Sequence, residues 1–296
     1  MDHTALRVFV AVAEHGSLTG AASQLCMSQP AVSLQLKKLQ SELCLVLFER
    51  NPRGMRLTDV GRKLLPAAQR AVNVVGEFSA AAKGLHDGVS GQLKIGTIVD
   101  PEFLRLGASL GRMAKRHPGL TFELRQGISG QVAQQVESGQ LDVGFTLGLP
   151  GFSDLSPKLS VQPLAALTYK VIAPAAWQSD VIGAGWAELA TLPWIQTPAE
   201  SVHARLLSNV FDRLDVQPKI AAQVDVEPSM LDLVKSGVAL SLARDNLAIQ
   251  ASHEHGVVVA DAVELQAELG IIFLRNRAAE PAIQAAVEQI SDAWGS

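Results

Sequence analysis

Residues 17–58 place the strongest constraint on this chain, because two short amphipathic segments are followed there by a basic hairpin pattern. Ser17 precedes the apolar positions of the first segment, and Ser28 precedes those of the second. Serine is a favoured N-cap, since its hydroxyl oxygen accepts a hydrogen bond from a free backbone N–H at a helix start. Pro30 falls near the start of the second segment, where a missing N–H costs nothing. The pattern predicts two helices joined by a tight turn at Cys26 and Met27.

The second of these helices is the candidate for a surface that reads DNA. Polar and apolar side chains at its exposed start are suited to base edges and thymine methyl groups: Ser28, Gln29, Pro30, Ser33 and Leu34. Lys37 and Lys38 follow one turn later and suit phosphates better than bases. The alternative is an ordinary helical hairpin in an all-α domain.

The hairpin pattern that follows favours DNA binding over that alternative. Residues 48–57 hold three arginines around Pro52 and Gly54, which are typical turn residues. Arg50 and Arg53 are expected to reach phosphates or the minor groove. Arginines at a surface turn are usually only solvated, so this pattern counts in combination with the two helices.

Taken together, residues 1–88 resemble the N-terminal region of LysR-type transcriptional regulators. The family pattern is matched at Leu6, Phe9, Gly16, Ser17, Ala21, Ala22, Leu25, Ser28, Gln29, Ala31, Val32, Ser33, Gln35, Leu39, Leu47, Phe48, Arg50, Arg53, Leu57, Thr58 and Gly61. The sequence departs from it at Gln40, where the family usually has Glu, and at Cys44, where it usually has Gly, a change that bears on the turn into the hairpin. The resemblance implies an all-α winged helix-turn-helix domain over residues 1–58.

Residues 59–88 predict one long helix with an apolar stripe. Thr58 is its expected N-cap, and Leu64, Ala71 and Phe78 recur every seven residues. The stripe extends further than its own domain needs for packing, although a helix packed on its own domain is the alternative. In the family the matching segment is a linker helix that forms an antiparallel dimer contact, so the resemblance implies a homodimer or homotetramer.

Charge is divided unevenly along the 296 residues. The net charge is −4, but residues 1–88 carry ten Lys/Arg against seven Asp/Glu, and the acidic excess lies after them. This basic excess is small, so at least a dimer is expected to supply enough phosphate contacts. The two cysteines, Cys26 and Cys44, form neither a disulfide framework nor a metal site, and both are expected to be buried. No apolar leader or membrane span is visible, so a cytoplasmic protein is expected.

From residue 92 onward the pattern changes to alternating strands and helices, which favours a largely parallel sheet covered on both faces. Residues 89–296 resemble the effector-binding domain of the family, an α/β domain with two lobes like the type II periplasmic binding proteins. On that template residues 92–162 and 268–296 form the first lobe, and residues 163–267 form the second. The resemblance places a small-molecule effector between the lobes.

Polar residues at strand ends and helix starts are the candidates for effector contacts: Thr97, Ile98, Asp100, Ser129, Thr146, Thr197, Ser201 and Glu227. For each hydroxyl, simple helix capping is at least as good an explanation. At the position of Asp100 the family often has a hydroxyl residue that holds an anion. We therefore expect an effector with an amine or other hydrogen-bond donor near Asp100, or Asp100 turned toward solvent.

Motifs of common enzyme classes are absent from the sequence. It contains no Walker A sequence, no His-Glu-x-x-His and no complete G-x-G-x-x-G, and the tripeptide at 253–255 is a poor metal site. A solute-binding protein without DNA binding is disfavoured by residues 1–88. The sequence and the resemblance together predict a transcriptional regulator that is not an enzyme, needs no cofactor or metal, binds double-stranded DNA and a small effector, and contacts RNA polymerase.

Overall fold

A computed structural model describes residues 2–51, 54–87, 89–98, 100–254 and 256–295. Three helices begin the chain: α1 (His3–His15), α2 (Leu18–Leu25) and α3 (Gln29–Leu43). The Ser17 Oγ accepts a hydrogen bond from Gly20 N at 3.1 Å, and the Ser28 Oγ accepts one from Ala31 N at 3.3 Å. Both serine N-caps are thereby confirmed.

Helices α2 and α3 each end at a cysteine in the left-handed conformation. Cys26 has φ 52° and Cys44 has φ 54°, and both are exposed. The expectation that both are buried is wrong. Each cysteine follows the last residue of its helix as a left-handed C-cap, so neither is part of the helix face that packs in the core. At Cys44 the turn keeps the backbone shape that a glycine would adopt with less strain.

A short hairpin follows, formed by β1 (Phe48–Asn51) and β2 (Gly54–Leu57). Helix α4 (Asp59–Asp87) comes next, with the Thr58 Oγ1 accepting from Gly61 N at 3.0 Å, so that the expected cap is confirmed. The first turns of α4 pack on α1, with Ala68 buried in the N-terminal core. Further along, Val74 and Phe78 are 59% and 75% exposed. The apolar stripe therefore extends beyond the part of the helix that its own domain covers.

The remaining chain is an α/β domain. Its first part contains β3 (Ser90–Thr97), α5 (Leu106–Arg116), β4 (Gly119–Gln126), α6 (Ser129–Glu137) and β5 (Val143–Gly148). The chain then continues through η1 (Pro150–Phe152), β6 (Leu159–Pro174), η2 (Ala175–Trp177), α7 (Gln178–Val181), α8 (Trp186–Leu189), β7 (Pro193–Gln196), α9 (Val202–Leu214), β8 (Lys219–Gln223), α10 (Glu227–Lys235), β9 (Ser241–Arg244), α11 (Asp245–Glu254), β10 (Val257–Leu274), η3 (Arg275–Arg277) and α12 (Pro281–Trp294).

In the part of the chain that the structure describes, the main sheet has six strands in the order β4-β3-β5-β10-β6-β9. Strand β3 pairs in parallel with β4 and β5, but β10 is antiparallel to β5 and β6, and β6 is antiparallel to β9. The sheet is therefore mixed, and the expectation of a largely parallel sheet is wrong. Strand β6 carries the chain from the first half of the domain into the second, and β10 carries it back. These two long strands are therefore antiparallel to each other.

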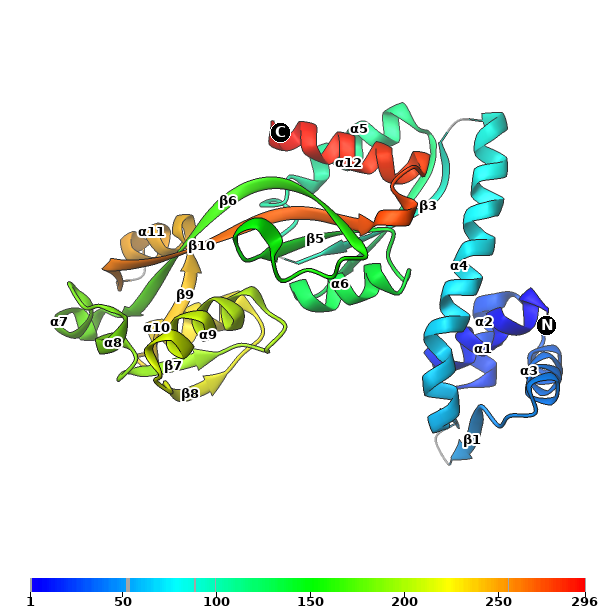
Figure 1. The fold of residues 1–296 in the computed structure, drawn as a ribbon, viewed down its shortest axis with the longest axis horizontal. Helices are drawn as coiled ribbons and strands as arrows, with labels where there is room; N and C mark the ends of the chain where they lie inside the picture. The colour runs from blue at the N-terminus through cyan, green and yellow to red at the C-terminus, as the bar shows by residue number, and fades with distance from the viewer. Residues whose placement is uncertain (1, 52–53, 88, 99, 255, 296) are drawn as a thin grey trace.

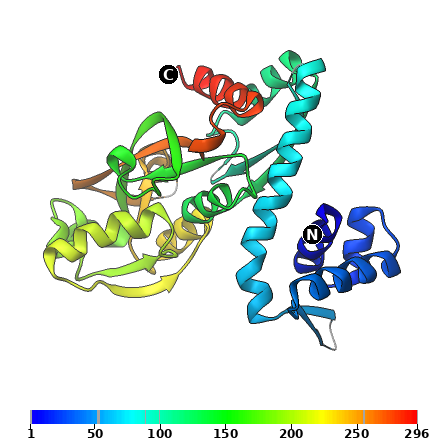
Figure 2. The ribbon, with the colours of Figure 1, turned by 45° about the vertical axis from the view of Figure 1, so that its right-hand side comes forward.

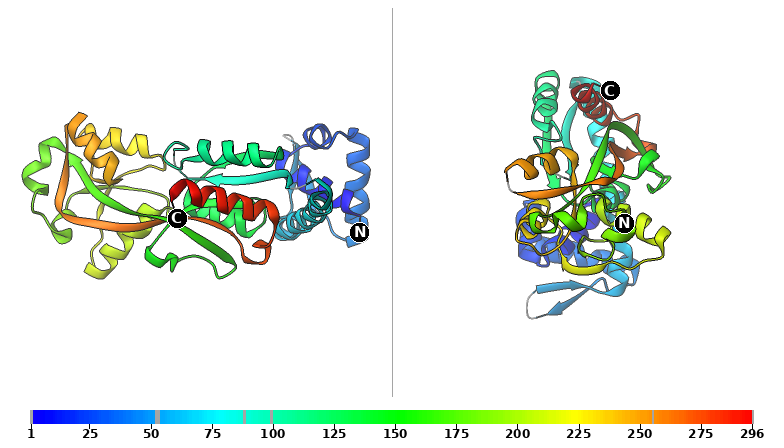
Figure 3. Two further views of the ribbon diagram at one scale, coloured as in Figure 1. Left: turned by 90° about the horizontal axis from the view of Figure 1, so that it is seen from above. Right: turned by 90° about the vertical axis from the view of Figure 1, so that its left-hand side faces the viewer.

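We call the part around β3, β4, β5, α5, α6 and α12 the first lobe, and the part around β7, β8, β9 and α7–α11 the second lobe. Strands β6 and β10 run through both (Figure 1). Seen from above, the N-terminal domain and the second lobe lie at opposite ends of the molecule with the first lobe between them (Figure 3). Helix α4 stands between the N-terminal helices and the α/β domain (Figure 2). The side chain of Asn73 on α4 donates to the carbonyl oxygen of Gly139 in the first lobe.

Candidate DNA-binding surface and effector site

The start of α3 presents a mixed polar and apolar surface to solvent. Gln29 and Pro30 are exposed, Leu34 is 67% exposed, and Ser33 is half-buried. The opposite face of α3 holds Val32, Leu36 and Leu39 in the N-terminal core. Because that core fixes the rotation of the helix, the exposed side chains form a rigid edge. Side chains of this kind on a helix start can enter a major groove.

Among the other residues predicted on this surface, Ser28 serves as the N-cap, which occupies its hydroxyl oxygen. Lys37 and Lys38 are exposed one turn further along. Arg53 lies outside the described residues, and of Arg50 the structure describes only the backbone, in β1. Arg56 on β2 is exposed and adds a positive charge to the described part of the hairpin.

Gln40 fixes the position of the hairpin relative to α3. Its Oε1 accepts hydrogen bonds from Leu47 N at 2.7 Å and from Phe48 N at 3.4 Å. The sequence marks Gln40 only as a departure from the family pattern, yet an amide oxygen accepts these bonds as a carboxylate would. On the other side, Met55 N donates to the carbonyl oxygen of Gly16 at 2.8 Å. The hairpin is therefore anchored to both α1 and α3.

Several hydroxyls predicted to contact an effector are used by the fold itself. The Ser129 Oγ accepts from Leu147 N at 3.1 Å, and the Thr97 Oγ1 donates to the carbonyl oxygen of Arg125 at 3.5 Å. Thr197 and Ser201 share a hydrogen bond of 2.5 Å between their hydroxyls. Ser201 also caps α9. Capping and strand bracing thus account for these four residues.

The other predicted effector residues fall into different environments. Asp100 is exposed, and its Oδ1 accepts from Glu102 N at 2.8 Å, so its carboxylate faces solvent as part of a local turn. Ile98 is half-buried and packs against the core of the domain. Thr146 is 1% exposed, and its Oγ1 has no hydrogen-bond partner among the described residues. A buried hydroxyl without a partner is unfavourable, and a ligand could satisfy it.

Glu227, the first residue of α10, forms a partly buried ion pair with Arg244 at the end of β9. The Nη2 of Arg244 donates to Glu227 Oε2 at 2.9 Å, and its Nε donates to Oε1 at 3.3 Å. The positive end of the α10 dipole also favours a carboxylate at this position. The ring of Phe103, from the first lobe, lies 4.1 Å from the guanidinium carbon. This pair therefore lies where the two lobes meet.

Two further side chains complete this cluster in the second lobe. Tyr169 on β6 and His203 on α9 are buried with ring centroids 5.0 Å apart. Burial raises the pKa of the Tyr169 hydroxyl well above its usual range, and the charge of Glu227 adds to this effect. Burial lowers the pKa of the His203 imidazole, although the negative charge of Glu227 acts to raise it. Both side chains are therefore neutral near pH 7.

A second ion pair joins the lobes at the start of α6. Arg205 on α9 forms a salt bridge with Asp154 in the first lobe, and its Nη2 donates to the carbonyl oxygen of Leu147 at 2.8 Å. Beside it lies a cavity of about 210 Å³ whose lining includes Ser129, Thr146 and Arg205. This cavity contains two of the predicted effector residues.

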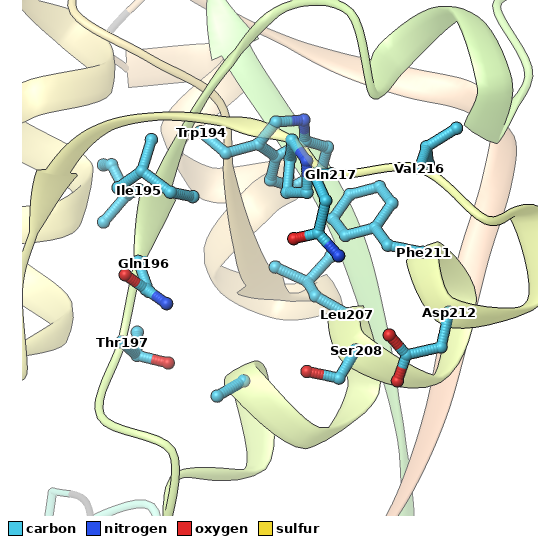
Figure 4. A pocket seen from close by; sticks show the side chains of 13 residues that line it. Trp194, Ile195, Gln196, Thr197, Leu207, Ser208, Phe211, Asp212, Val216 and Gln217 are labelled. Atoms are coloured by element: carbon cyan, nitrogen blue, oxygen red, sulfur yellow. The ribbon is translucent and has the colours of Figure 1, made fainter.

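A separate cavity of about 150 Å³ lies within the second lobe, between α9 and the β7–β8 sheet. Thr197 is the predicted effector residue that lines it, opposite Ser208 and Asp212 on α9 (Figure 4). The eight predicted effector residues are thus not gathered in one place. Ser129 and Thr146 share one cavity, Thr197 lines another, and Glu227 belongs to the cluster with Arg244, Tyr169 and His203.

Arg244, Arg205 and Phe103 were not among the residues predicted from the sequence. Arg244 carried a usable signal, because a lone arginine ends the apolar run at 238–244 and a charge at the end of a buried strand requires a partner. No sequence signal pointed to Arg205 or Phe103, since their importance comes only from contacts with the other lobe.

No group of three or more His, Cys, Asp or Glu side chains suited to a metal occurs in the described ranges. His255, the last residue of the tripeptide discussed above, lies outside them. Among the described residues, no helix has the length and apolar character needed to span a membrane.

Comparison with known proteins gives matches along almost the whole chain. Residues 3–62 match the family described as bacterial regulatory helix-turn-helix protein, lysR family, and residues 86–295 match the LysR substrate binding domain. The chain is 27% identical over 296 residues to a probable RuBisCO transcriptional regulator of Trichormus variabilis. The aligned region covers 96% of this chain and 86% of that protein.

Solved structures show the same fold. Full-length CbnR complexed with its target DNA has a TM-score of 0.64 and 22% identity, covering 99% of this chain and 100% of the other. LysG from Corynebacterium glutamicum with bound effector Arg has a TM-score of 0.60 and 16% identity, covering 99% and 98%. Both similarities cover the N-terminal helices and the α/β domain together.

Proposed function

Because this chain belongs to the LysR family of DNA-binding transcriptional regulators, we propose that it binds the operator of its target genes as a homodimer or homotetramer, under the control of a small molecule bound between its lobes. The observation that carries this proposal is the rigid exposed start of α3. Gln29, Pro30 and Leu34 face solvent there, while the other face of the helix is fixed in the core.

On DNA, α3 lies in the major groove. Gln29 and Ser33 contact base edges, and Pro30 and Leu34 contact thymine methyl groups. Lys37, Lys38 and the hairpin residues Arg50 and Arg53 neutralise phosphates in the backbone or the minor groove. The target DNA in the CbnR complex is a property of that protein, but the shared fold supports this arrangement.

The dimer contact that we propose lies along α4. Val74 and Phe78 are large apolar side chains exposed on this helix beyond the part that packs on α1. Burying an apolar side chain of this size contributes roughly 1.5–3 kcal/mol, so a second copy of α4 is a favourable partner. Two copies of α3 then read two half-sites of an imperfect palindrome.

We place the effector between two lobes. The first comprises residues 92–162 and 268–296, and the second comprises residues 163–267. Arg205–Asp154 and Phe103–Arg244 both cross from one lobe to the other. A ligand that changes these contacts changes how the lobes sit, and through the assembly it changes the bend of the bound DNA and the contact with RNA polymerase. Such a role is exercised in the cytoplasm and requires no catalysis.

Fluorescence anisotropy with purified protein tests this proposal. A duplex from the region upstream of the protein's own gene is compared with a scrambled duplex of the same length at several salt concentrations. We expect the upstream duplex to bind about a thousandfold more tightly or better at moderate salt. Equal affinity for both duplexes, with a monomeric protein in sedimentation, would overturn the proposal.

A further inference from the structure

The guanidinium of Arg244 is buried with one of its two hydrogen-bonding edges unused. Its Nε and Nη2 donate to the two carboxylate oxygens of Glu227, while its Nη1 has no partner among the described residues. Arg244 is only 5% exposed, so water does not readily replace a missing acceptor. A planar guanidinium offers a second fork at Nη1 and Nη2 that matches a carboxylate.

Charge in this cluster is balanced without a ligand. Tyr169 lies directly opposite Arg244 in the β6–β9 ladder, and His203 packs against Tyr169. Both rings are neutral, so Glu227 and Arg244 supply the charges. A carboxylate on the free fork would place two negative groups around one guanidinium. A second positive charge is then needed next to Glu227, whose oxygens each retain a lone pair.

We infer that the effector between the lobes is an amphoteric small molecule of the α-amino acid class, whose carboxylate binds the free fork of Arg244 and whose ammonium group binds Glu227. This inference rests on the proposed function, because it names the ligand class of the same interlobe site. A simple acid lacks the cation that Glu227 requires. A simple amine leaves the Nη1 of Arg244 without an acceptor.

Access to this site depends on the lobes. Phe103 belongs to the first lobe and covers one face of the guanidinium at 4.1 Å, a favourable cation–π contact. Opening of the lobes withdraws Phe103 and exposes the free fork. Ligand binding at Arg244 and the relative position of the lobes are thereby coupled.

The test uses the full-length protein and a matched panel: the twenty standard amino acids, the acids that lack the α-amino group, and the amines that lack the carboxyl group. Thermal shift finds the binders, and calorimetry measures their affinity. We expect at least one amino acid to bind about tenfold or more tightly than both of its analogues, since each analogue loses one charge-assisted contact. If no amino acid binds, or if an acid analogue binds as tightly as its amino acid, the inference is wrong.

Two variants sharpen this test. In Glu227→Gln the preference for the amino acid over its deaminated acid should fall by about tenfold, because the partner of the ammonium group has lost its charge. Glu102→Gln, an exposed carboxylate in the turn that carries Phe103, makes the same charge change and should keep the preference. If Glu227→Gln does not fold, the wild-type panel still decides the ligand class.

Operator binding of the ligand-free protein is measured in parallel. Loss of operator preference would overturn the proposed function whatever the panel shows. If the operator is bound normally but no amino acid in the panel binds, this inference alone is overturned and the proposed function stands.

Discussion

The backbone N–H of Gly130 donates to the carbonyl oxygen of Glu200 at 3.1 Å, which joins the start of α6 in the first lobe to the loop before α9 in the second. A Cβ atom at Gly130 would lie 2.6 Å from the Cβ of Glu200, closer than packed atoms allow. This N–H would be free in an open cleft. Here the chain's own carbonyl occupies the place that an anion would take at a helix start.

Gly130→Ala should therefore push the lobes apart at this point. We expect the free energy of unfolding to fall by about 1–3 kcal/mol, measured by chemical denaturation. The matched control is Gly111→Ala in α5, where an added Cβ meets nothing within 4 Å. That change should stabilise the protein by up to about 1 kcal/mol, because alanine is the better helix former. Equal effects of the two changes would contradict the close contact.

The Arg205–Asp154 salt bridge should couple the lobes more strongly than a surface pair would. Its side chains are 23% and 15% exposed, whereas those of Arg116 and Glu288 are 60% and 54% exposed. A double-mutant cycle with Arg205→Gln and Asp154→Asn should give a coupling of about 1–3 kcal/mol. The same cycle on Arg116 and Glu288 should give under about 1 kcal/mol. A reversed order would show that the interlobe pair contributes little.

Cys44→Gly should stabilise the N-terminal domain. Cys44 has φ 54°, and its left-handed backbone costs a residue with a Cβ roughly 1 kcal/mol relative to glycine. Thermal unfolding should therefore occur at higher temperature in this variant. Cys44→Ala keeps the Cβ and should show no gain, which separates backbone strain from the loss of the thiol.

Gln29→Ala should reduce discrimination between operator and random DNA by about 1–3 kcal/mol, because it removes a side chain suited to base edges. Lys37→Ala is the matched control on the same helix. It should weaken binding to all sequences evenly and make the dependence of affinity on salt less steep. Anisotropy titrations at several salt concentrations distinguish the two variants. If Lys37→Ala lowered the discrimination and Gln29→Ala weakened all binding evenly, the roles assigned along α3 would be wrong.

Stability should depend on pH through His203. Burial lowers the pKa of its imidazole in the folded protein, so the unfolded chain binds a proton more readily. The free energy of unfolding should be at its full value above the unfolded pKa of about 6.5 and fall as the pH drops below it, by at most about 1.4 kcal/mol per pH unit. His203→Phe keeps an aromatic ring and should reduce this slope.

Local signals in the sequence predicted much of this fold. Ser17, Ser28 and Thr58 mark helix starts because capping depends on a residue and its next few neighbours. The strand and helix alternation from residue 92 onward also follows local periodicity. The family resemblance, carried by residues 1–88, supplied the identity of both domains.

Contacts between distant segments could not be predicted in the same way. The direction of β10 relative to β6 depends on where the chain returns, so the sheet was wrongly expected to be largely parallel. Arg244 and Glu227 are brought together by the packing of β9 against α10, and Phe103 reaches them from another lobe. Periodicity within one segment contains no information on such partners.

The two long strands also make the second lobe an exchangeable unit. Its segment leaves the first lobe and returns to it at paired positions, with Gln162 opposite Ile271 and Val161 opposite Ile272. A segment whose ends are hydrogen-bonded neighbours can be replaced without displacing the remaining chain. We expect chimeras that take residues 163–267 from a relative to keep the proposed operator preference of this protein and to acquire part of the effector specificity of the donor.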